Sequence, residues 1–239
     1  MTKPEPFPVR PGTLFKEGVQ GYFGNIVPLT AAALVTLTVF YLIVALPASQ
    51  LNDNSKWVRG FAFAGGLILT GTTAYPWYSY ALDAGDGIRV RWKRPFEKPE
   101  LFVQQAVSSF WFWAAVALGF QYLFATPAIF VVILYAFHGY LIADRRSTSG
   151  MKALGTSVRL GEGSRIILFG LFALFGFFSL LGAIPLGIQG DDGEPLINVF
   201  TVSLAVVGLA LTTSVTLVAG GRIYRILLGR LIARDKAPR

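Results

Sequence analysis

The chain has 239 residues, of which 54% are hydrophobic and 14% charged, whereas soluble domains average roughly 25% charged residues. This composition, with its apolar residues in long runs, favours an integral membrane protein over a soluble domain. The net charge of +8 then indicates basic cytoplasmic loops and no nucleic-acid partner, and the lack of cysteine excludes disulfides and thiolate metal sites.

The N-terminal segment, residues 1–11, is rich in proline and lacks an apolar h-region. We therefore expect a disordered cytoplasmic N-terminus without a cleavable signal, and a first span that serves as an uncleaved anchor. The stretch 12–23 is predicted to form a short amphipathic helix in the plane of the membrane.

Six apolar segments are predicted to cross the bilayer, whose hydrocarbon core of about 30 Å requires roughly 20 residues of helix. The third and fourth come from one uncharged stretch that is too long for a single crossing, and we divide it at Pro127 because proline suits the first turn of a helix. The predicted spans lie near 26–46, 60–82, 106–125, 127–143, 165–188 and 198–221. They form a membrane domain over residues 12–229, followed by a basic cytoplasmic tail over residues 230–239.

The distribution of basic residues predicts the orientation of these spans. Of the 21 Lys and Arg residues, all but Lys56 and Arg59 lie before the first span, in loops 83–105 and 144–165, or after the last span. Lysine and arginine collect in cytoplasmic loops. We therefore expect a multi-pass protein of the bacterial inner membrane with both termini in the cytoplasm.

A weak internal repeat accompanies the spans. The stretch with Leu14 and Gly21 resembles the stretch with Leu154 and Gly161, each just before a span, and residues 96–113 form a looser third copy. The predicted fold class is therefore an all-α integral membrane protein with three transmembrane hairpins, each preceded by a short amphipathic in-plane helix.

The segment 149–160, which we call the elbow, is predicted to be one of these in-plane helices. Ser147, Thr148 or Ser149 can cap its N-terminus, and Gly161 can end it in the left-handed conformation. Apolar and basic residues alternate at helical spacing, as on a helix that lies among lipid headgroups. The residues predicted to contact anionic lipid or a partner are Arg145, Arg146, Met151, Lys152, Leu154, Val158 and Arg159.

A phosphate-binding loop is the alternative for the elbow. Gly150 and Gly155 have the spacing of the Walker A motif, but Thr156 stands where the motif requires lysine, and no strand precedes the segment. We therefore expect the membrane-surface helix and no nucleotide cofactor.

Ionisable residues are almost absent from the predicted spans, which disfavours a proton-coupled transporter. His138 is the exception, and its predicted role is an interhelical hydrogen bond rather than proton transfer or metal ligation. Asp83, Asp86 and Asp144 could serve hydrolysis or bind magnesium, but neighbouring arginines favour local ion pairing. The acidic turn 190–195 could hold calcium only weakly, and no catalytic or metal site is predicted.

Small residues in the last two spans are predicted to pack helices closely, because they let helix backbones approach one another. A docking face for a partner is the alternative use. The residues concerned are Gly170, Gly176, Gly182, Ala210, Ser214, Thr216 and Gly220.

The motifs "ADRRSTSGMKALGTSVRL", "LLGAIPLGI" and "RIYRIL" resemble the YciC-like family of six-helix bacterial inner-membrane proteins. That family is related to the membrane domain fused to some glycerophosphodiester phosphodiesterases. The resemblance is best over residues 125–228 and looser over 12–105, and it places the characteristic Ala and Ser of the short helix at Ala153 and Ser157. It implies fold and location, and it carries over no phosphodiesterase activity because the catalytic domain has no counterpart here.

The expected function is that of a non-enzymatic scaffold, an accessory subunit of a membrane complex or a lipid-organising factor. Its expected partners are anionic lipids and a membrane protein or a second copy of the chain. The alternative is part of a transporter, or a facilitator, for an apolar or lipid-like solute. A polar cavity would favour transport and a dry interior would favour the scaffold; the cavity candidates are Thr70, Thr72, Thr73, Gln121 and His138. An enzyme would require the three aspartates to converge on one pocket.

Overall fold

The computed structural model describes the backbone of residues 10–45, 56–122, 126–190 and 196–236. Side chains are described for residues 10–43, 64–119, 128–190 and 196–236. Within these ranges the regular structure is helical, and four helices are long and apolar enough to cross a membrane: Ile26–Ile43, Glu100–Gly119, Arg165–Gly187 and Val199–Lys236. The expected all-helical class is thus confirmed. The acidic turn after Gly190 lies mostly outside the described residues.

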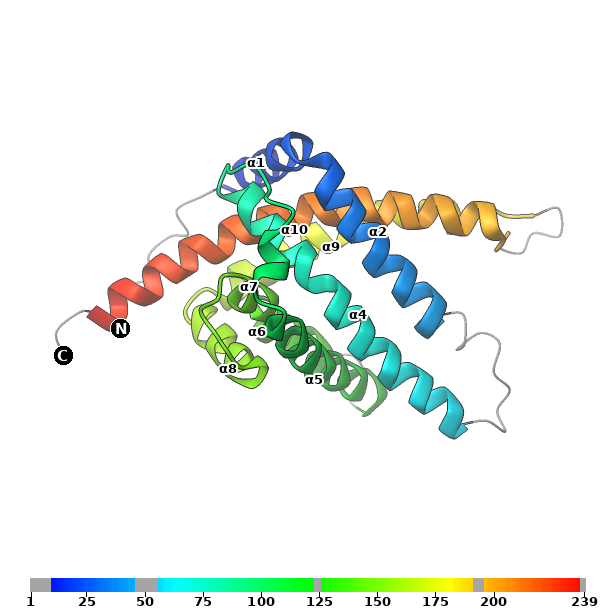
Figure 1. The fold of residues 1–239 in the computed structure, drawn as a ribbon, viewed down its shortest axis with the longest axis horizontal. Helices are drawn as coiled ribbons and strands as arrows, with labels where there is room; N and C mark the ends of the chain where they lie inside the picture. The colour runs from blue at the N-terminus through cyan, green and yellow to red at the C-terminus, as the bar shows by residue number, and fades with distance from the viewer. Residues whose placement is uncertain (1–9, 46–55, 123–125, 191–195, 237–239) are drawn as a thin grey trace.

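The first hairpin follows a helix that lies across its end (Figure 1). Helix α1 (Pro11–Gly24) begins at a proline and meets α2 (Ile26–Phe40) at Asn25. The Asn25 amide donates to the Gly21 carbonyl (3.2 Å) and accepts a bond from the Val90 backbone amide (2.8 Å), so this corner is held to the loop after α4. Helix α2 continues as the π-helical turn η1 (Tyr41–Ala45), and α4 spans Lys56–Gly85.

The second hairpin differs from its prediction at two places. A four-residue 3₁₀ turn, η3 (Arg94–Glu97), precedes α5 (Glu100–Tyr122), so the amphipathic helix expected before this hairpin is not formed. Pro95 and Pro99 explain this, because proline is disfavoured inside a helix and α5 begins directly after Pro99. The predicted span 127–143 is divided into α6 (Thr126–Tyr135) and α7 (His138–Ala143).

A side chain from the elbow occupies the break between α6 and α7. Ser157 Oγ donates to the Leu134 carbonyl (2.9 Å) and accepts from the Phe137 amide (3.1 Å). These bonds satisfy backbone groups of the interrupted helix. The elbow itself is α8 (Gly150–Leu160), close to the predicted 149–160.

The third hairpin ends in the longest helix. Helix α9 (Arg165–Leu180) continues as the 3₁₀ helix η4 (Leu181–Gly187), and α10 spans Val199–Lys236. At 1.5 Å per residue α10 is roughly 57 Å long, more than the hydrocarbon core requires. Its regular structure therefore continues past the predicted span 198–221 and includes most of the predicted tail.

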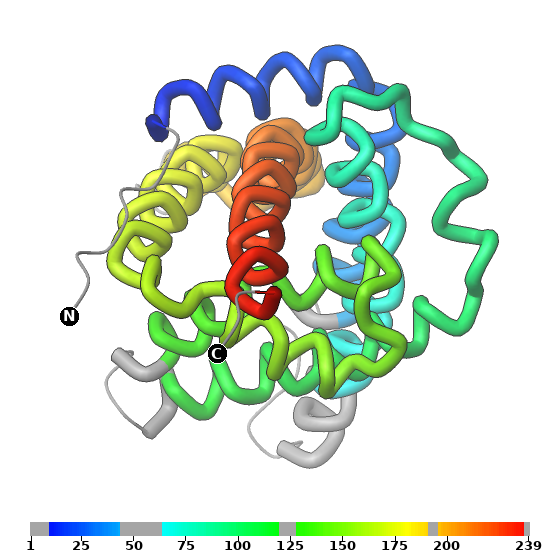
Figure 2. Tube along the Cα trace, turned by 90° about the vertical axis from the view of Figure 1, so that its left-hand side faces the viewer, coloured from blue at the N-terminus to red at the C-terminus, as the bar shows by residue number. Residues whose placement is uncertain are grey.

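Helix α10 is the central element of the bundle. It packs against α1, α2, α4, α8, α9 and η4, and Figure 2 shows it surrounded by the other segments. Close backbone contacts make this possible: a Cβ at Gly18 would lie 2.8 Å from the Val215 carbonyl, and a Cβ at Gly182 would overlap the backbone of Gly208. The core therefore forms where small residues bring helices onto α10.

Candidate functional site: a charged layer at one end of the bundle

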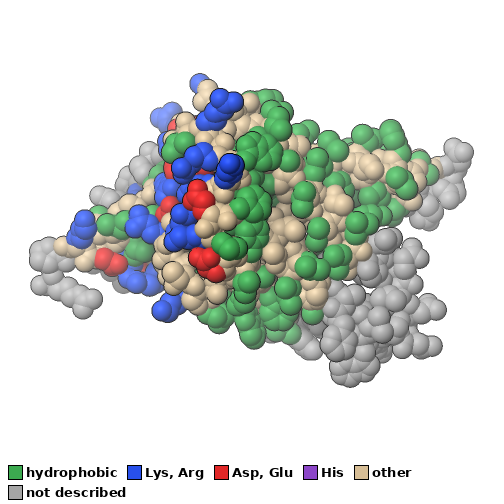
Figure 3. Space-filling model, viewed as in Figure 1, with side chains coloured by type: hydrophobic (Ala, Val, Ile, Leu, Met, Phe, Trp, Pro, Cys, Tyr) green, Lys and Arg blue, Asp and Glu red, His purple; other side chains and the backbone are tan. Residues whose placement is uncertain are grey.

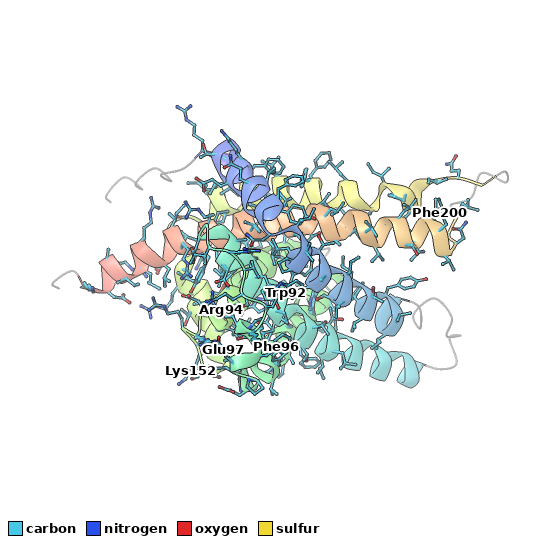
Figure 4. The ribbon with its side chains drawn as sticks, turned by 45° about the horizontal axis from the view of Figure 1, so that its top comes forward. Trp92, Arg94, Phe96, Glu97, Lys152 and Phe200 are labelled. Carbon is cyan, nitrogen blue, oxygen red and sulfur yellow. The ribbon has the colours of Figure 1, made fainter. Side chains whose placement is uncertain are left out.

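Charged side chains gather at the end of the bundle that contains α1, η3, the end of α7 and the C-terminal part of α10. Figure 3 shows Lys and Arg interspersed with Asp and Glu there, and hydrophobic side chains over the remaining body on this face. Figure 4 places Arg94, Glu97 and Lys152 in this region and Phe200 near the opposite end of α10. We call this end the charged layer.

Arg225 of α10 joins two aspartates in the charged layer. It donates from Nη2 to Asp86 Oδ2 (2.7 Å), from Nε to Asp86 Oδ1 (3.0 Å) and from Nη1 to Asp144 Oδ1 (2.8 Å). The Tyr224 hydroxyl donates to the second oxygen of Asp144 (2.9 Å). The C-terminal ends of α4 and α7 are thereby fastened to one guanidinium of α10.

A second group of charges lies between α4, η3 and the loop after α7. Asp83 is buried and pairs with Arg94, while Arg145 donates to Glu97 Oε2 (2.6 Å) and to the Arg94 carbonyl (3.2 Å). Arg145 has a positive φ of 59°, which is uncommon for a residue with a side chain. Burial lowers the pKa of Arg94, and the hydrogen bond from Arg145 lowers the pKa of Glu97.

Ion pairs also attach α1 and α8 to α10. Glu17 of α1 accepts from Arg222 (2.9 Å). Arg159 pairs with Asp235 (3.2 Å), and Glu162 pairs with Arg234 (3.0 Å). The last two pairs are about half exposed, so each contributes little stability, whereas the Arg225 pairs are shielded more fully from solvent.

The three aspartates considered as catalytic candidates are held by arginines instead. Asp86 and Asp144 meet at Arg225, whereas Asp83 binds Arg94. Ion pairing of these aspartates was expected, but with arginines close to them in sequence. Of the observed partners, only Arg146, which donates to Asp144 (3.2 Å), is such a neighbour. Arg225 was not among the predicted site residues, although an arginine within the apolar "RIYRIL" motif could have indicated it.

Within the described residues, His138 makes no hydrogen bond to another predicted span. Its Nδ1 lies 2.7 Å from the Tyr135 carbonyl, three residues earlier, and its ring stacks on Phe112 at a centroid distance of 5.0 Å. Thr72 and Thr73 donate to carbonyls of their own helix, α4. The Gln121 side chain lies outside the described residues. Of the described cavity candidates, Thr72, Thr73 and His138 therefore bond locally, whereas Thr70 Oγ1 is buried without a partner in the described residues.

The elbow faces the protein differently from the prediction. Gly150, Ala153, Leu154, Ser157 and Leu160 are buried, whereas Met151 is 54% exposed. The predicted apolar face was therefore wrong for Leu154, which packs with Phe112, Val116 and Ala128 and is not open to lipid. Small residues decide the orientation, because the Gly150 amide donates to Gln104 Oε1 of α5 (2.9 Å) and Ser157 reaches the helix break.

The ends of the elbow also differ from expectation. Ser149 occupies the N-cap position but makes no side-chain capping bond, and the Ser147 hydroxyl donates to the Ser149 carbonyl instead (2.8 Å). Gly161 has a φ of −76°, so it is not left-handed; Gly163 is, with a φ of +80°. Val158 is half-buried, and Lys152 and Arg159 are exposed.

The predicted packing residues fall into two groups. In the first group, a Cβ added at Gly182 would overlap Gly208, and a Cβ added at Gly220 would contact the Tyr140 hydroxyl. Ala210 is buried. The Ser214 hydroxyl accepts from Trp77 (3.0 Å), and Thr216 bonds with Ser179 (3.1 Å). Gly170 and Gly176, in contrast, have no atom within 4 Å of an added Cβ, so the packing predicted for them within the chain is not found.

The described residues contain no group of three or more His, Asp or Glu side chains that could hold a metal ion. No known protein family, curated protein or solved structure matches this chain.

Proposed function

We propose that the protein is a non-enzymatic, six-span protein of the bacterial inner membrane that organises anionic lipid at the cytoplasmic surface, with both termini in the cytoplasm. The observation that carries this proposal is a surplus of cations in the charged layer. The arginines described above form ion pairs with the carboxylates. Further basic side chains are exposed and contact no acid in the described part of the chain. Among them are Lys16, Arg89, Lys93, Lys152 and Arg165.

Surplus cations next to an apolar body suit a bilayer surface that carries anionic lipid. Each basic residue near such a surface contributes about 1 kcal/mol of attraction. The exposed Trp92 lies in the same layer, where amphipathic rings favour the membrane interface (Figure 4). The four apolar helices would span the bilayer, and α4 and the pair α6–α7 would supply the two further crossings.

We also propose that the chain belongs to the YciC-like family. Ala153 and Ser157, the residues that carried the resemblance in the short helix, are fully buried, and Ser157 bridges the α6–α7 break. A structural role of this kind supports a shared fold and says nothing of a reaction.

The test is purification of the full chain in mild detergent, followed by native mass spectrometry after addition of phosphatidylglycerol or phosphatidylcholine. We expect retained phosphatidylglycerol, and several-fold less of it in the combined variant Lys16→Gln, Arg89→Gln, Lys152→Gln. The matched control exchanges the same residues for the other basic residue (Lys16→Arg, Arg89→Lys, Lys152→Arg) and should retain the lipid. Equal retention of both lipids by every variant would refute the proposal.

A transport component for a lipid-like solute is the second candidate, and buried polar atoms favour it. Thr70 Oγ1, Gln105 Oε1 and His138 Nε2 are buried without a hydrogen-bond partner on α4, α5 and α7. Unpaired buried polar groups are costly and call for an explanation such as a passing solute. Movement of a fluorescent phospholipid between leaflets in vesicles containing the protein, but not in empty vesicles, would support this candidate over the scaffold.

A further inference from the structure

An apolar groove of about 550 Å³ lies between α6 and the start of α9. Its volume is within the range of about 300–1,000 Å³ that is typical of small-molecule sites. The residues that line it are Ile129, Phe130, Ile133, Leu134, Arg165, Ile166 and Phe169. Six of these are apolar, so the groove offers no hydrogen bonds to a polar solute except through Arg165.

Arg165 is the first residue of α9 and therefore lies at the end of the groove next to the charged layer. Its side chain is exposed and contacts no carboxylate in the described residues. The nearest acid along the chain, Glu162, is already paired with Arg234 (3.0 Å). The groove thus combines an apolar wall with one uncompensated cation at its headgroup end.

We propose that this groove binds a phospholipid with a net negative headgroup, with the phosphate on Arg165 and the upper part of one acyl chain between α6 and α9. The inference rests on the proposed membrane function and names a site for the lipid. Charge complementarity selects this occupant: an apolar helix of a partner protein would fill the groove but would leave the guanidinium without an anion.

The length of the groove also explains why only the part of the acyl chain nearest the glycerol is held. Five residues of α9, from Arg165 to Phe169, extend the groove by roughly 8 Å along the helix axis. Ile166 and Phe130 are 87% and 61% exposed, so the groove is open to the side and a lipid can enter from the bilayer.

The experiment is photo-crosslinking of the full-length protein with phosphatidylglycerol that carries a diazirine near the glycerol end of one acyl chain. Peptide mapping should place the crosslinks in α6 and the first turns of α9. Arg165→Gln should reduce them about fivefold, which corresponds to the about 1 kcal/mol of one basic residue near an anionic surface. Arg165→Lys should keep most of them, and the matching phosphatidylcholine probe should give few.

Two controls separate this site from general charge and general exposure. Lys236→Gln removes one positive charge at the end of α10, away from the groove, and should leave the crosslinks unchanged. Ile129→Trp should block the groove, whereas Val207→Trp should not, although the two positions are equally exposed at 45% and 44%. Crosslinks spread evenly around the apolar surface, or unaffected by Arg165→Gln, would overturn the inference.

Native mass spectrometry distinguishes this failure from failure of the proposed function. If phosphatidylglycerol remains bound but crosslinks outside α6 and α9, the site is wrong and the lipid-organising function stands. If no phosphatidylglycerol is retained, both are wrong. If a second protein chain copurifies and the probe labels neither α6 nor α9, the groove belongs to a helix partner and the inference fails.

Discussion

The guanidinium of Arg225 lies 2.8 Å from the carboxylate of Asp144, although 81 positions separate the two residues in the chain. Because Arg225 also holds Asp86, one side chain connects the end of the first hairpin, the end of the second and the central helix of the third. The three hairpins are thereby joined at the charged layer, where the apolar surface ends.

Replacing Arg225 should therefore destabilise the bundle. Arg225→Gln leaves Asp86 and Asp144 without their main counter-charge in a site where they are 22% and 10% exposed. We expect a loss of about 2–3 kcal/mol, below the about 3–5 kcal/mol of a fully buried pair. Thermal unfolding in detergent measures this, with Arg234→Gln as the control, because that exposed pair should contribute at most about 1 kcal/mol. Equal melting temperatures for the two variants would contradict the role given to Arg225.

Ser157 should stabilise the break between α6 and α7. Ser157→Ala removes the donor to Leu134 and the acceptor for Phe137, and a buried group left unsatisfied costs about 1–3 kcal/mol. The control is Thr156→Ala, one position away on the half-buried side of α8. Hydrogen exchange of the Phe137 amide should accelerate in Ser157→Ala and remain unchanged in the control; unchanged exchange in both would disprove the bridge.

Gly182 and Gly176 should respond oppositely to the same substitution. An alanine at Gly182 would overlap the backbone of Gly208 and force η4 away from α10, with a cost of about 1–3 kcal/mol. At Gly176 nothing lies within 4 Å, so alanine should be neutral or stabilise the helix by up to about 1 kcal/mol. Thermal unfolding of both variants provides the comparison, and a destabilised Gly176→Ala would point to an unrecognised contact at that face.

The Arg145–Glu97 pair should make stability depend on acidic pH. The folded pKa of Glu97 is lowered from its ordinary value near 4.5, chiefly by the hydrogen bond from Arg145. The pair therefore contributes above pH 4.5, and its contribution is lost as the pH falls through the lower folded value. The free energy of unfolding, measured from pH 6 to pH 3, should decline less steeply in Glu97→Gln than in the parent chain. Parallel declines would exclude the pair as a contributor.

The orientation of the chain can be tested because it contains no cysteine. A cysteine at Gly190 should react with an impermeant thiol reagent added to intact cells, and a cysteine at Gly155 should react only after the membrane is opened. Gly155 is suitable because an added Cβ there meets no atom within 4 Å, whereas at Gly150 it would lie 2.6 Å from the Gln104 carbonyl. Reaction at Gly155 alone in intact cells would reverse the proposed topology.

Local sequence signals predicted several elements closely. Amphipathic spacing followed by a glycine sufficed for α1 and α8, because this signal acts over a few residues. The same signals failed at the orientation of α8, where Leu154 was assigned to lipid and is buried in the protein. In a membrane chain an apolar residue can face lipid or protein equally well, so hydrophobicity alone cannot orient a helix.

By itself, the sequence determined the helical class, the apolar segments and the clustering of basic residues, since each follows from composition and short-range spacing. Only the tertiary structure decided that Arg225 joins Asp86 to Asp144, that Ser157 bridges the α6–α7 break and that Arg165 lies at the end of an apolar groove. These contacts depend on how distant helices pack around α10, and the geometry of that packing comes from close approaches such as Gly182 on Gly208, whose partners no local pattern identifies.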